Sequence, residues 1–162
     1  KGVDTLLHAL RSMANVRAEI IGDGPEWPTL AALARQLNLN ATITFCGRLN
    51  AVATRKRLAN AHALVLDSEY EGFSHILLEA SAMGLVCIAS RCGGNPEIIL
   101  DGATGMLVPP RDATALRLAI TRCRDDEPFR YRLATAAQAA SPRFAFSTTV
   151  QQTTAVLERL MV

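Results

Sequence analysis

The sequence lacks the features that mark several common classes of protein. Its longest apolar runs fall far short of the roughly 20 residues that a membrane-spanning helix needs. No charge of one sign dominates, because 17 Lys and Arg stand against 15 Asp and Glu, which leaves a formal net charge of +2. Nucleic-acid-binding domains usually present a clustered basic face, so we expect no nucleic acid among the partners. An anionic membrane surface stays open as a partner.

Cysteine pairs of the C-x-x-C type and a signal peptide are missing as well. The four cysteines mostly lie in apolar runs (Cys46, Cys87, Cys92 and Cys123). We interpret them as reduced residues in or near the core of a cytoplasmic protein, and we expect no metal site. The opening KGVDTLL has neither the regions of a signal peptide nor an initiator Met, so we expect a fragment. The turn GDGP does not match G-x-G-x-x-G, which leaves an NAD site little support.

What the sequence does contain is a regular alternation of helical and strand-like periods. The strand-like runs are apolar throughout, which is typical of parallel strands that are buried on both faces and flanked by helices. With right-handed connections, this pattern predicts an α/β fold with a Rossmann-like doubly wound parallel sheet. At 162 residues the chain suits one domain. The expected strands are 17–22, 42–46, 63–67, 86–90 and a short one within 105–110.

Helical periods fill the intervals between these strands. One begins within VDTLLHALRSM, and one within EWPTLAALARQLNL is closed by Asn38 or Asn40. Three more finish the chain, starting near Asp112, Pro128 and Ser147. Polar and Gly-rich loops follow four of the strands: GDGP, GRLN, SEYEGFS and RCGGNP. Ligands of such sheets bind at the carboxyl ends of the strands, so we expect one elongated site along that edge.

The stretch EYEGFSHILLEASAMG, residues 69–84, holds two acids eight positions apart, Glu71 and Glu79. If a helix begins near Ser74, Gly72 permits the tight turn before it and the Ser74 hydroxyl can cap it. The free amides of the first turn and the helix dipole would then suit a phosphate or diphosphate. Carboxylates repel phosphate, so the two acids are expected to accept hydrogen bonds from hydroxyls on either side of it. A nucleotide sugar has that layout.

Plainer interpretations of the two acids stay open. Glu71 can be a loop-surface acid and Glu79 a solvated helix residue. Glu79 nevertheless stands in an apolar run, where burying an unpaired carboxylate costs several kcal/mol. Lys56 or Arg57 could supply a purely structural partner. The single Trp, Trp27, is interpreted as packing on or capping the GDGP turn.

Taken in order, the motifs KG, IIGDGP, FCGRL, SEYEGF, LLEASAMG, CGGNPEII and DGATGMLVPP resemble one family. That family is the C-terminal, nucleotide-sugar-binding domain of GT-B fold retaining glycosyltransferases, specifically the family 4 group. The resemblance implies that Glu71 contacts hydroxyls of the donor sugar and Glu79 the donor ribose. It implies further roles for these residues: Lys1 on the diphosphate, Gly72 in the turn, backbone amides of Phe73, Ser74 and His75 near the diphosphate and sugar, Arg48 and Leu49 beside the base, and Gly93 and Gly94 in close backbone approach near the transferred sugar.

The resemblance also implies a domain plan and a reaction. Residues 1–162 are then a single C-terminal donor-binding domain, one half of a GT-B architecture, with the first strand, its Arg loop and the N-terminal acceptor domain upstream. The parent protein is expected to transfer a hexose from a nucleoside-diphosphate sugar, without a metal, to a saccharide or lipid-linked acceptor in surface polysaccharide biosynthesis. Lys1 and Glu71 are its expected catalytic residues. Because the reaction occurs between two domains, this chain alone is expected to be inactive.

The same resemblance places the parent in the cytoplasm, with peripheral association at the inner face of the membrane. Two alternatives remain. A stand-alone nucleotide-binding module without activity fits the chain as given. A GT-B fold sugar-nucleotide epimerase shares the architecture but needs catalytic acids and a His that we cannot place in this sequence.

Overall fold

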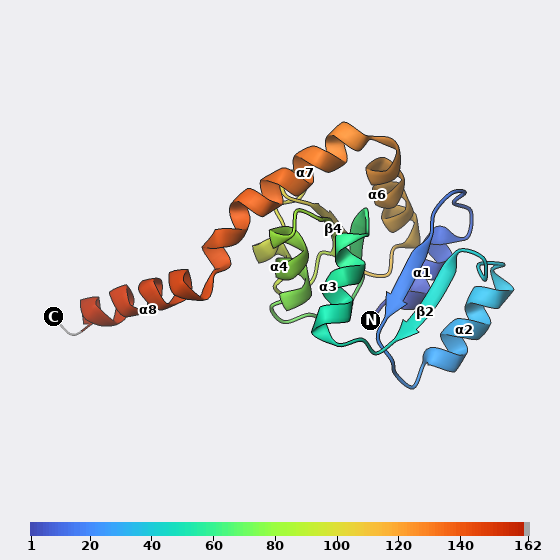
Figure 1. Ribbon diagram of the computed structural model, residues 1–162, viewed down its shortest axis with the longest axis horizontal. Coiled ribbons are helices and arrows are strands. Elements are labelled where there is room, and N and C mark those ends of the chain that lie inside the picture. Colours follow the sequence, from blue (N-terminus) through green and yellow to red (C-terminus); the bar gives the residue numbers. More distant parts are fainter. Residues whose placement is uncertain (161–162) are drawn as a thin grey trace.

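The computed structural model describes residues 1–160, and every strand expected from the sequence is present in it. All strand pairs are parallel, and helices lie on both faces, so the α/β class is confirmed (Figure 1). The strands are β1 Ala18–Ile21, β2 Ile43–Gly47, β3 Ala63–Leu66, β4 Val86–Ser90 and β5 Met106–Val108.

The helices begin and end close to the expected positions. Asp112 accepts hydrogen bonds from the amides of Thr114 and Ala115 and so caps α6, and Asn50 caps α3 in the same way. Asn38 takes a positive φ of 58° just after α2, which confirms it as the residue that closes this helix. The helices are α1 Val3–Leu10, α2 Trp27–Gln36, α3 Ala51–Ala59, α4 His75–Ala82, α5 Asn95–Ile98, α6 Ala113–Asp125, α7 Glu127–Ala140 and α8 Phe146–Leu160, with a 3₁₀ turn, η1, over Ser141–Phe144.

The expectation of one continuous sheet is wrong in one respect, because the strands form two parallel sheets. One has the order β1-β2 and the other β3-β4-β5. Between them lies a groove of about 1140 Å³, whose walls include β1, β3, α1 and α3. β3 and β1 are only partly buried as a result, whereas β4 is buried along its whole length. Hydrophobic periodicity identifies strands but does not say which strand lies beside which.

The core has two parts, one on each face of β4. Val86 and Ile88 point to the part formed with α1, α6 and α7, while Cys87 and Ala89 point to the part formed with α4 and α5. This period of two is what a strand buried on both faces requires. β4 is therefore the most firmly held element, and its carboxyl end supplies the base of the candidate site.

The C-terminal part of the described chain leaves the body of the fold. α8 extends away from the other helices in Figure 1. It begins at Phe146, one residue before the expected Ser147. Before it, η1 packs against α4 and α7, and the ring of Phe144 lies 5.6 Å from that of Phe73. Within residues 1–160, no helix is both long enough and apolar enough to cross a membrane.

Candidate functional site

The candidate site lies where β3 and β4 end and α4 begins. α4 starts at His75 with Ser74 in the N-cap position, as expected. The Ser74 hydroxyl, however, makes no capping hydrogen bond and is buried, so that part of the expectation is wrong. The first helical hydrogen bond runs from the Leu78 amide to the Ser74 carbonyl, at 3.3 Å. Earlier amides of this turn are thus left for a partner outside the helix.

Two strand-end loops are held together by backbone contacts. The Gly94 amide donates to the Gly72 carbonyl at 3.2 Å. A Cβ on Gly93, which has a φ of 49°, would lie 1.6 Å from the Glu71 carbonyl oxygen, and one on Gly94 would lie 2.7 Å from that of Gly72. Both positions therefore require glycine. Within the chain, Gly93 and Gly94 approach the backbone of residues 71–72. Their close approach to a donor sugar stays a prediction.

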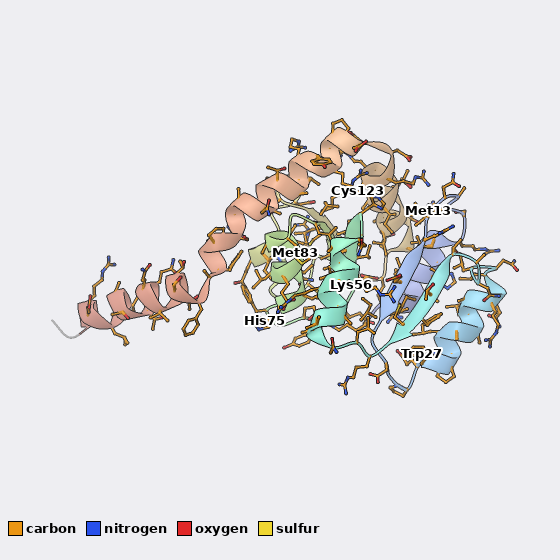
Figure 2. All side chains as sticks on the ribbon, in the orientation of Figure 1. Met13, Trp27, Lys56, His75, Met83 and Cys123 are labelled. Atoms are coloured by element: carbon orange, nitrogen blue, oxygen red, sulfur yellow. The ribbon has the colours of Figure 1, made fainter. Side chains whose placement is uncertain are left out.

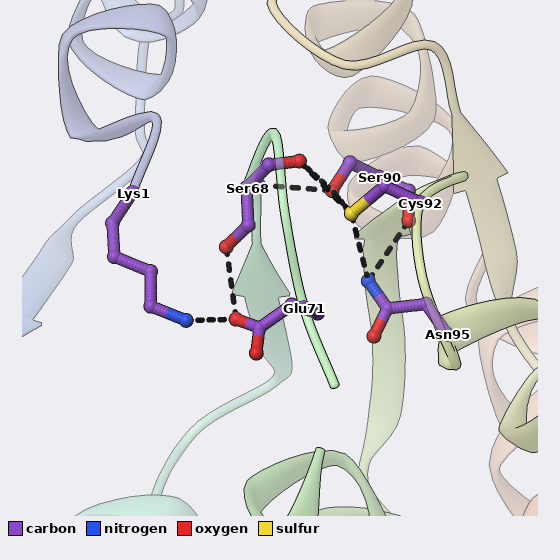
Figure 3. Close-up of polar contacts among 6 residues, drawn as sticks. All are labelled: Lys1, Ser68, Glu71, Ser90, Cys92 and Asn95. Atoms are coloured by element: carbon purple, nitrogen blue, oxygen red, sulfur yellow. Dashed lines mark hydrogen bonds and ion pairs between the residues drawn. The ribbon is translucent and has the colours of Figure 1, made fainter. Parts of the chain in front are cut away.

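Glu71 is a largely buried acid in this site. Its side chain is 13% exposed, so the interpretation as a loop-surface acid is wrong. Its Oε1 contacts the Lys1 ammonium and accepts a hydrogen bond from the Ser68 hydroxyl at 3.0 Å (Figure 3). Lys1 is 60% exposed and reaches Glu71 from the start of the chain. The two expected catalytic residues thus lie side by side, joined as an ion pair.

Glu79 lies on α4 but outside this cluster. Its side chain is 44% exposed, and its Oε2 is 3.7 Å from the Arg55 Nε on α3. The expected structural partners, Lys56 and Arg57, are therefore wrong; Arg57 pairs with Glu19 at 2.7 Å instead. An exposed pair of this kind stabilises a fold by about 0–1 kcal/mol, which leaves Glu79 free to exchange Arg55 for a ligand hydroxyl.

The remaining predicted residues divide between the two sheets. His75 is exposed, and Phe73 is half-exposed against Phe144; both belong to the β3–β4 side. Arg48 is 84% exposed, 4.0 Å from the Asp23 carboxylate, and with the half-buried Leu49 it belongs to the β1–β2 side.

Trp27 lies on the β1–β2 side as well, well apart from His75 in Figure 2. Its ring lies 5.5 Å from that of Phe45 and 3.6 Å from where a Cβ on Gly47 would be. The Trp27 ring thus packs on the end of β2, while its amide donates to the Gly24 carbonyl at 3.1 Å and so caps the GDGP turn as expected. The groove between the sheets separates the two halves of the expected elongated site.

Sequence reasoning missed the polar residues beneath Glu71. Ser68, Ser90 and Asn95 are buried and linked, because the Ser90 hydroxyl bonds the Ser68 backbone and the Asn95 amide donates to the Ser90 carbonyl at 2.9 Å. The available signal was their position, since Ser68 and Ser90 stand at or just after the end of an apolar strand and Asn95 begins the helix that follows β4.

Asp67 is a second buried acid that the sequence did not reveal. Burial raises the pKa of its carboxyl above the ordinary value, an effect that the nearby Thr5 hydroxyl and Arg111 amide offset only in part. Neither Asp67 oxygen has a hydrogen-bond partner of full geometry among the described residues. The Asp67 carbonyl accepts from the Gly2 amide at 2.7 Å, which holds the start of the chain against the end of β3.

Metal chemistry has no visible site in the described part of the chain. Within residues 1–160, no group of three or more His, Cys, Asp or Glu side chains is placed to hold an ion. The four thiols are free, with Cys87 and Cys123 buried and Cys46 and Cys92 partly so, in line with the expected reduced core or near-core residues. Burial raises the pKa of the Cys87 thiol to about 12, which keeps it protonated.

Comparison with known proteins matches residues 1–140 with the family described as Glycosyl transferases group 1. N-acetyl-alpha-D-glucosaminyl L-malate synthase of Bacillus anthracis is 39% identical over 112 residues, which are 68% of this chain and 29% of that protein. The lipopolysaccharide core biosynthesis glycosyltransferase LpsE of Rhizobium meliloti is 31% identical over 134 residues, 83% of this chain and 39% of that protein. The structure of HepE of Anabaena in complex with UDP-glucose has a TM-score of 0.89 at 26% identity, covering 98% of this chain and 45% of that one. The chain thus spans less than half the length of each.

Proposed function

This chain belongs to the glycosyl transferases group 1 family, and from that premise we propose that it binds the nucleotide-sugar donor of a glycosyltransferase. The observation that carries the proposal is the meeting of Lys1, the buried Glu71 and the start of α4 at one strand edge. HepE, whose fold this chain shares, was solved with UDP and with UDP-glucose. The solved structures that it resembles are GT-B glycosyltransferases.

The site supplies the groups that such a donor needs. The first-turn amides of α4 and its dipole suit the diphosphate, and the exposed ammonium of Lys1 adds a point charge beside it. When the diphosphate binds, Lys1 exchanges part of its contact with Glu71 for a phosphate oxygen. All contacts of Glu71 within the described residues use Oε1, so Oε2 is available to accept a hydrogen bond from a hydroxyl of the donor sugar.

We place the reaction in the retaining class, with no metal. The acceptor hydroxyl attacks on the face from which the diphosphate leaves, and the leaving oxygen gains negative charge. Lys1 and the α4 amides stabilise that charge, which is electrostatic catalysis by donors already in position. Glu71 orients the sugar, while Glu79 accepts from the ribose hydroxyls and releases Arg55.

The relatives include a lipopolysaccharide core biosynthesis glycosyltransferase and a glycogen synthase, which supports a hexosyltransferase acting in surface polysaccharide synthesis. We place the parent protein in the cytoplasm at the inner face of the membrane. In this proposal residues 1–162 form the C-terminal donor half, and an N-terminal domain binds the acceptor. A further parallel strand in the groove between β1 and β3 would join the two sheets into the single sheet expected from the sequence.

The proposal is tested by calorimetric titration with UDP, GDP and ADP. We expect one of the three to bind and the Glu79→Ala variant to lose about tenfold in affinity, the usual loss for one hydrogen bond to a charged group. Glu127→Ala is the matched control, because Glu127 also pairs with an Arg at 3.7 Å, on α7, away from the site. Binding of no nucleotide, by the chain or by an N-terminally extended form, would contradict the proposal.

A further inference from the structure

We propose that Ser68 and Ser90 are positioning residues that fix the Glu71 carboxylate for the donor sugar. The role toward a donor sugar rests on the proposed function. The fixing of the Glu71 carboxylate does not, because it depends only on contacts within the chain. The residues concerned are drawn in Figure 3.

Backbone contacts with the 91–95 loop hold the chain at Glu71 and Gly72 but do not fix the Glu71 side chain. The ladder between β3 and β4 ends at the pair Leu66 and Ala89, so residue 68 onward has no strand partner on that side. Gly72 follows Glu71 directly, and a Cβ added to Gly72 would have no other atom within 4 Å, so that side of the loop is unpacked. A glutamate side chain on such a loop has several rotamers, and ordering them costs conformational entropy.

Ser90 replaces the missing strand pairing with its side chain. Its hydroxyl accepts from the Ser68 amide at 2.9 Å and donates to the Ser68 carbonyl at 2.6 Å. One hydroxyl thus satisfies both backbone groups of Ser68, as a neighbouring strand would have done. The Cys92 thiol adds a weaker contact to the same carbonyl, at 3.1 Å.

Ser90 is itself rigid, which makes it suited to this role. It is fully buried, it is paired with Val108 in the ladder of β4 and β5, and its carbonyl accepts from the Asn95 side-chain amide at 2.9 Å. Its hydroxyl is therefore fixed by the most buried strand of the fold. Through its two hydrogen bonds, this hydroxyl restrains the backbone of Ser68.

Ser68 in turn restrains the Glu71 carboxylate. Its hydroxyl donates to Glu71 Oε1 at 3.0 Å, and it is buried, so no solvent competes for the contact. Lys1 contacts the same oxygen but is 60% exposed and has a long flexible stem. When Lys1 moves to a diphosphate, Ser68 remains as the donor that keeps Glu71 in one rotamer, with Oε2 available for a ligand. A group held this way binds its ligand without paying the ordering cost again.

If the two serines have only a structural role, their loss should lower the affinity for all ligands equally. If they position Glu71, their loss should lower the affinity only for ligands that carry the sugar. The affinities to be measured are those of a nucleoside diphosphate and of its glucose ester, starting with UDP and UDP-glucose. Ser68→Ala and Ser90→Ala should weaken the glucose ester about tenfold and the diphosphate less than about twofold. Ser68→Thr, which keeps the hydroxyl, should restore the affinity for the glucose ester. Ser141→Ala, which removes a serine hydroxyl bonded to the Gln138 carbonyl outside the 68–74 and 91–95 loops, is the matched control.

A double-mutant cycle separates action through Glu71 from a general effect. In a Glu71→Ala background, Ser68→Ala should cause no further loss for the glucose ester. Equal losses for both ligands, or additive losses in the cycle, would overturn the proposal.

A measurement without ligand keeps this inference separate from the proposed function. Carbon-13 relaxation of the Glu71 side chain should indicate one rotamer in the parent chain and averaging over several in Ser68→Ala and Ser90→Ala. An unchanged side chain in both variants refutes the positioning role whether or not any nucleotide binds. If the relaxation changes and neither the unmutated chain nor an N-terminally extended form binds a nucleotide, the positioning stands and the donor function falls.

Discussion

Asp67 shows how a single residue can set the pH response of the fold. Its carboxyl is buried beside Gly2, so close that a Cβ on that glycine would lie 2.4 Å from Oδ2. Because burial raises its pKa, the folded chain holds this proton at pH values where the unfolded chain has lost it. Ionisation of Asp67 therefore costs stability, and that cost is absent below the ordinary pKa near 4 and develops as pH rises through the raised value.

The prediction concerns Asp67→Asn, which removes the charge at nearly the same volume. Relative to the parent, its free energy of unfolding should rise by about 1 kcal/mol at pH 7 and by little at pH 3.5. Urea unfolding at a series of pH values measures this, with the exposed Glu158→Gln as control. A constant difference between Asp67→Asn and the parent at all pH values would show that the charge is not responsible.

At the scale of elements, the candidate site depends on how two loops meet. The loops after β3 and β4 touch through backbone atoms at Gly93 and Gly94, so a side chain at either position would displace the 71–72 backbone and with it Glu71. The conformation of the 91–95 loop and that of the 68–74 loop are therefore set together.

Gly93→Ala tests this coupling. The new Cβ would meet the Glu71 carbonyl at a positive φ, so we expect a loss of at least about 3 kcal/mol in unfolding free energy, or displacement of Glu71 with loss of donor affinity. Gly102→Ala is the control, since Gly102 also has a positive φ, 71°, but open space around it. There only the backbone strain of about 1–2 kcal/mol applies. Similar losses in the two variants would contradict a loop contact as the cause.

The elements were largely predictable from the sequence, and their contacts were not. The β-branched runs gave the strands, and Asn38 and Asp112 marked a helix end and a helix start, because these signals are local. The pairing of Glu79 with Arg55 rather than Lys56 depends on how α3 and α4 lie together, which no local pattern records. Ser90 was missed for the same reason, since its role exists only beside Ser68.

At the scale of the whole molecule, the groove between β1 and β3 is the main departure from the expected single sheet. Its lining combines apolar residues of both strands, such as Ile21 and Val65, with charged residues such as Glu19 and Lys56. The apolar part of this lining is what a further parallel strand would cover. Strands of this fold span about 17 Å over five residues, so one short strand matches the length of its neighbours.

We predict that an N-terminal extension able to form such a strand will fill this groove. The amides of β1 and β3 should then exchange with solvent at least about tenfold more slowly, and the midpoint of thermal unfolding should rise by several degrees. An extension of equal length made of Gly and Ser is the control. If the two extensions protect β1 and β3 equally, the groove is not a strand site.

The groove also bears on the tendency of this chain to aggregate through the edges of its sheets. The open sides of β1 and β3 carry unpaired backbone groups of the kind that recruit strands from other molecules into aggregates. Here those sides face each other across the groove, and α1 and α3 form part of its walls, so these helices hinder the edge of another molecule's sheet from lying flat against either strand. The helices that would enclose a single added strand thus also act as a barrier to edge-to-edge aggregation at β1 and β3.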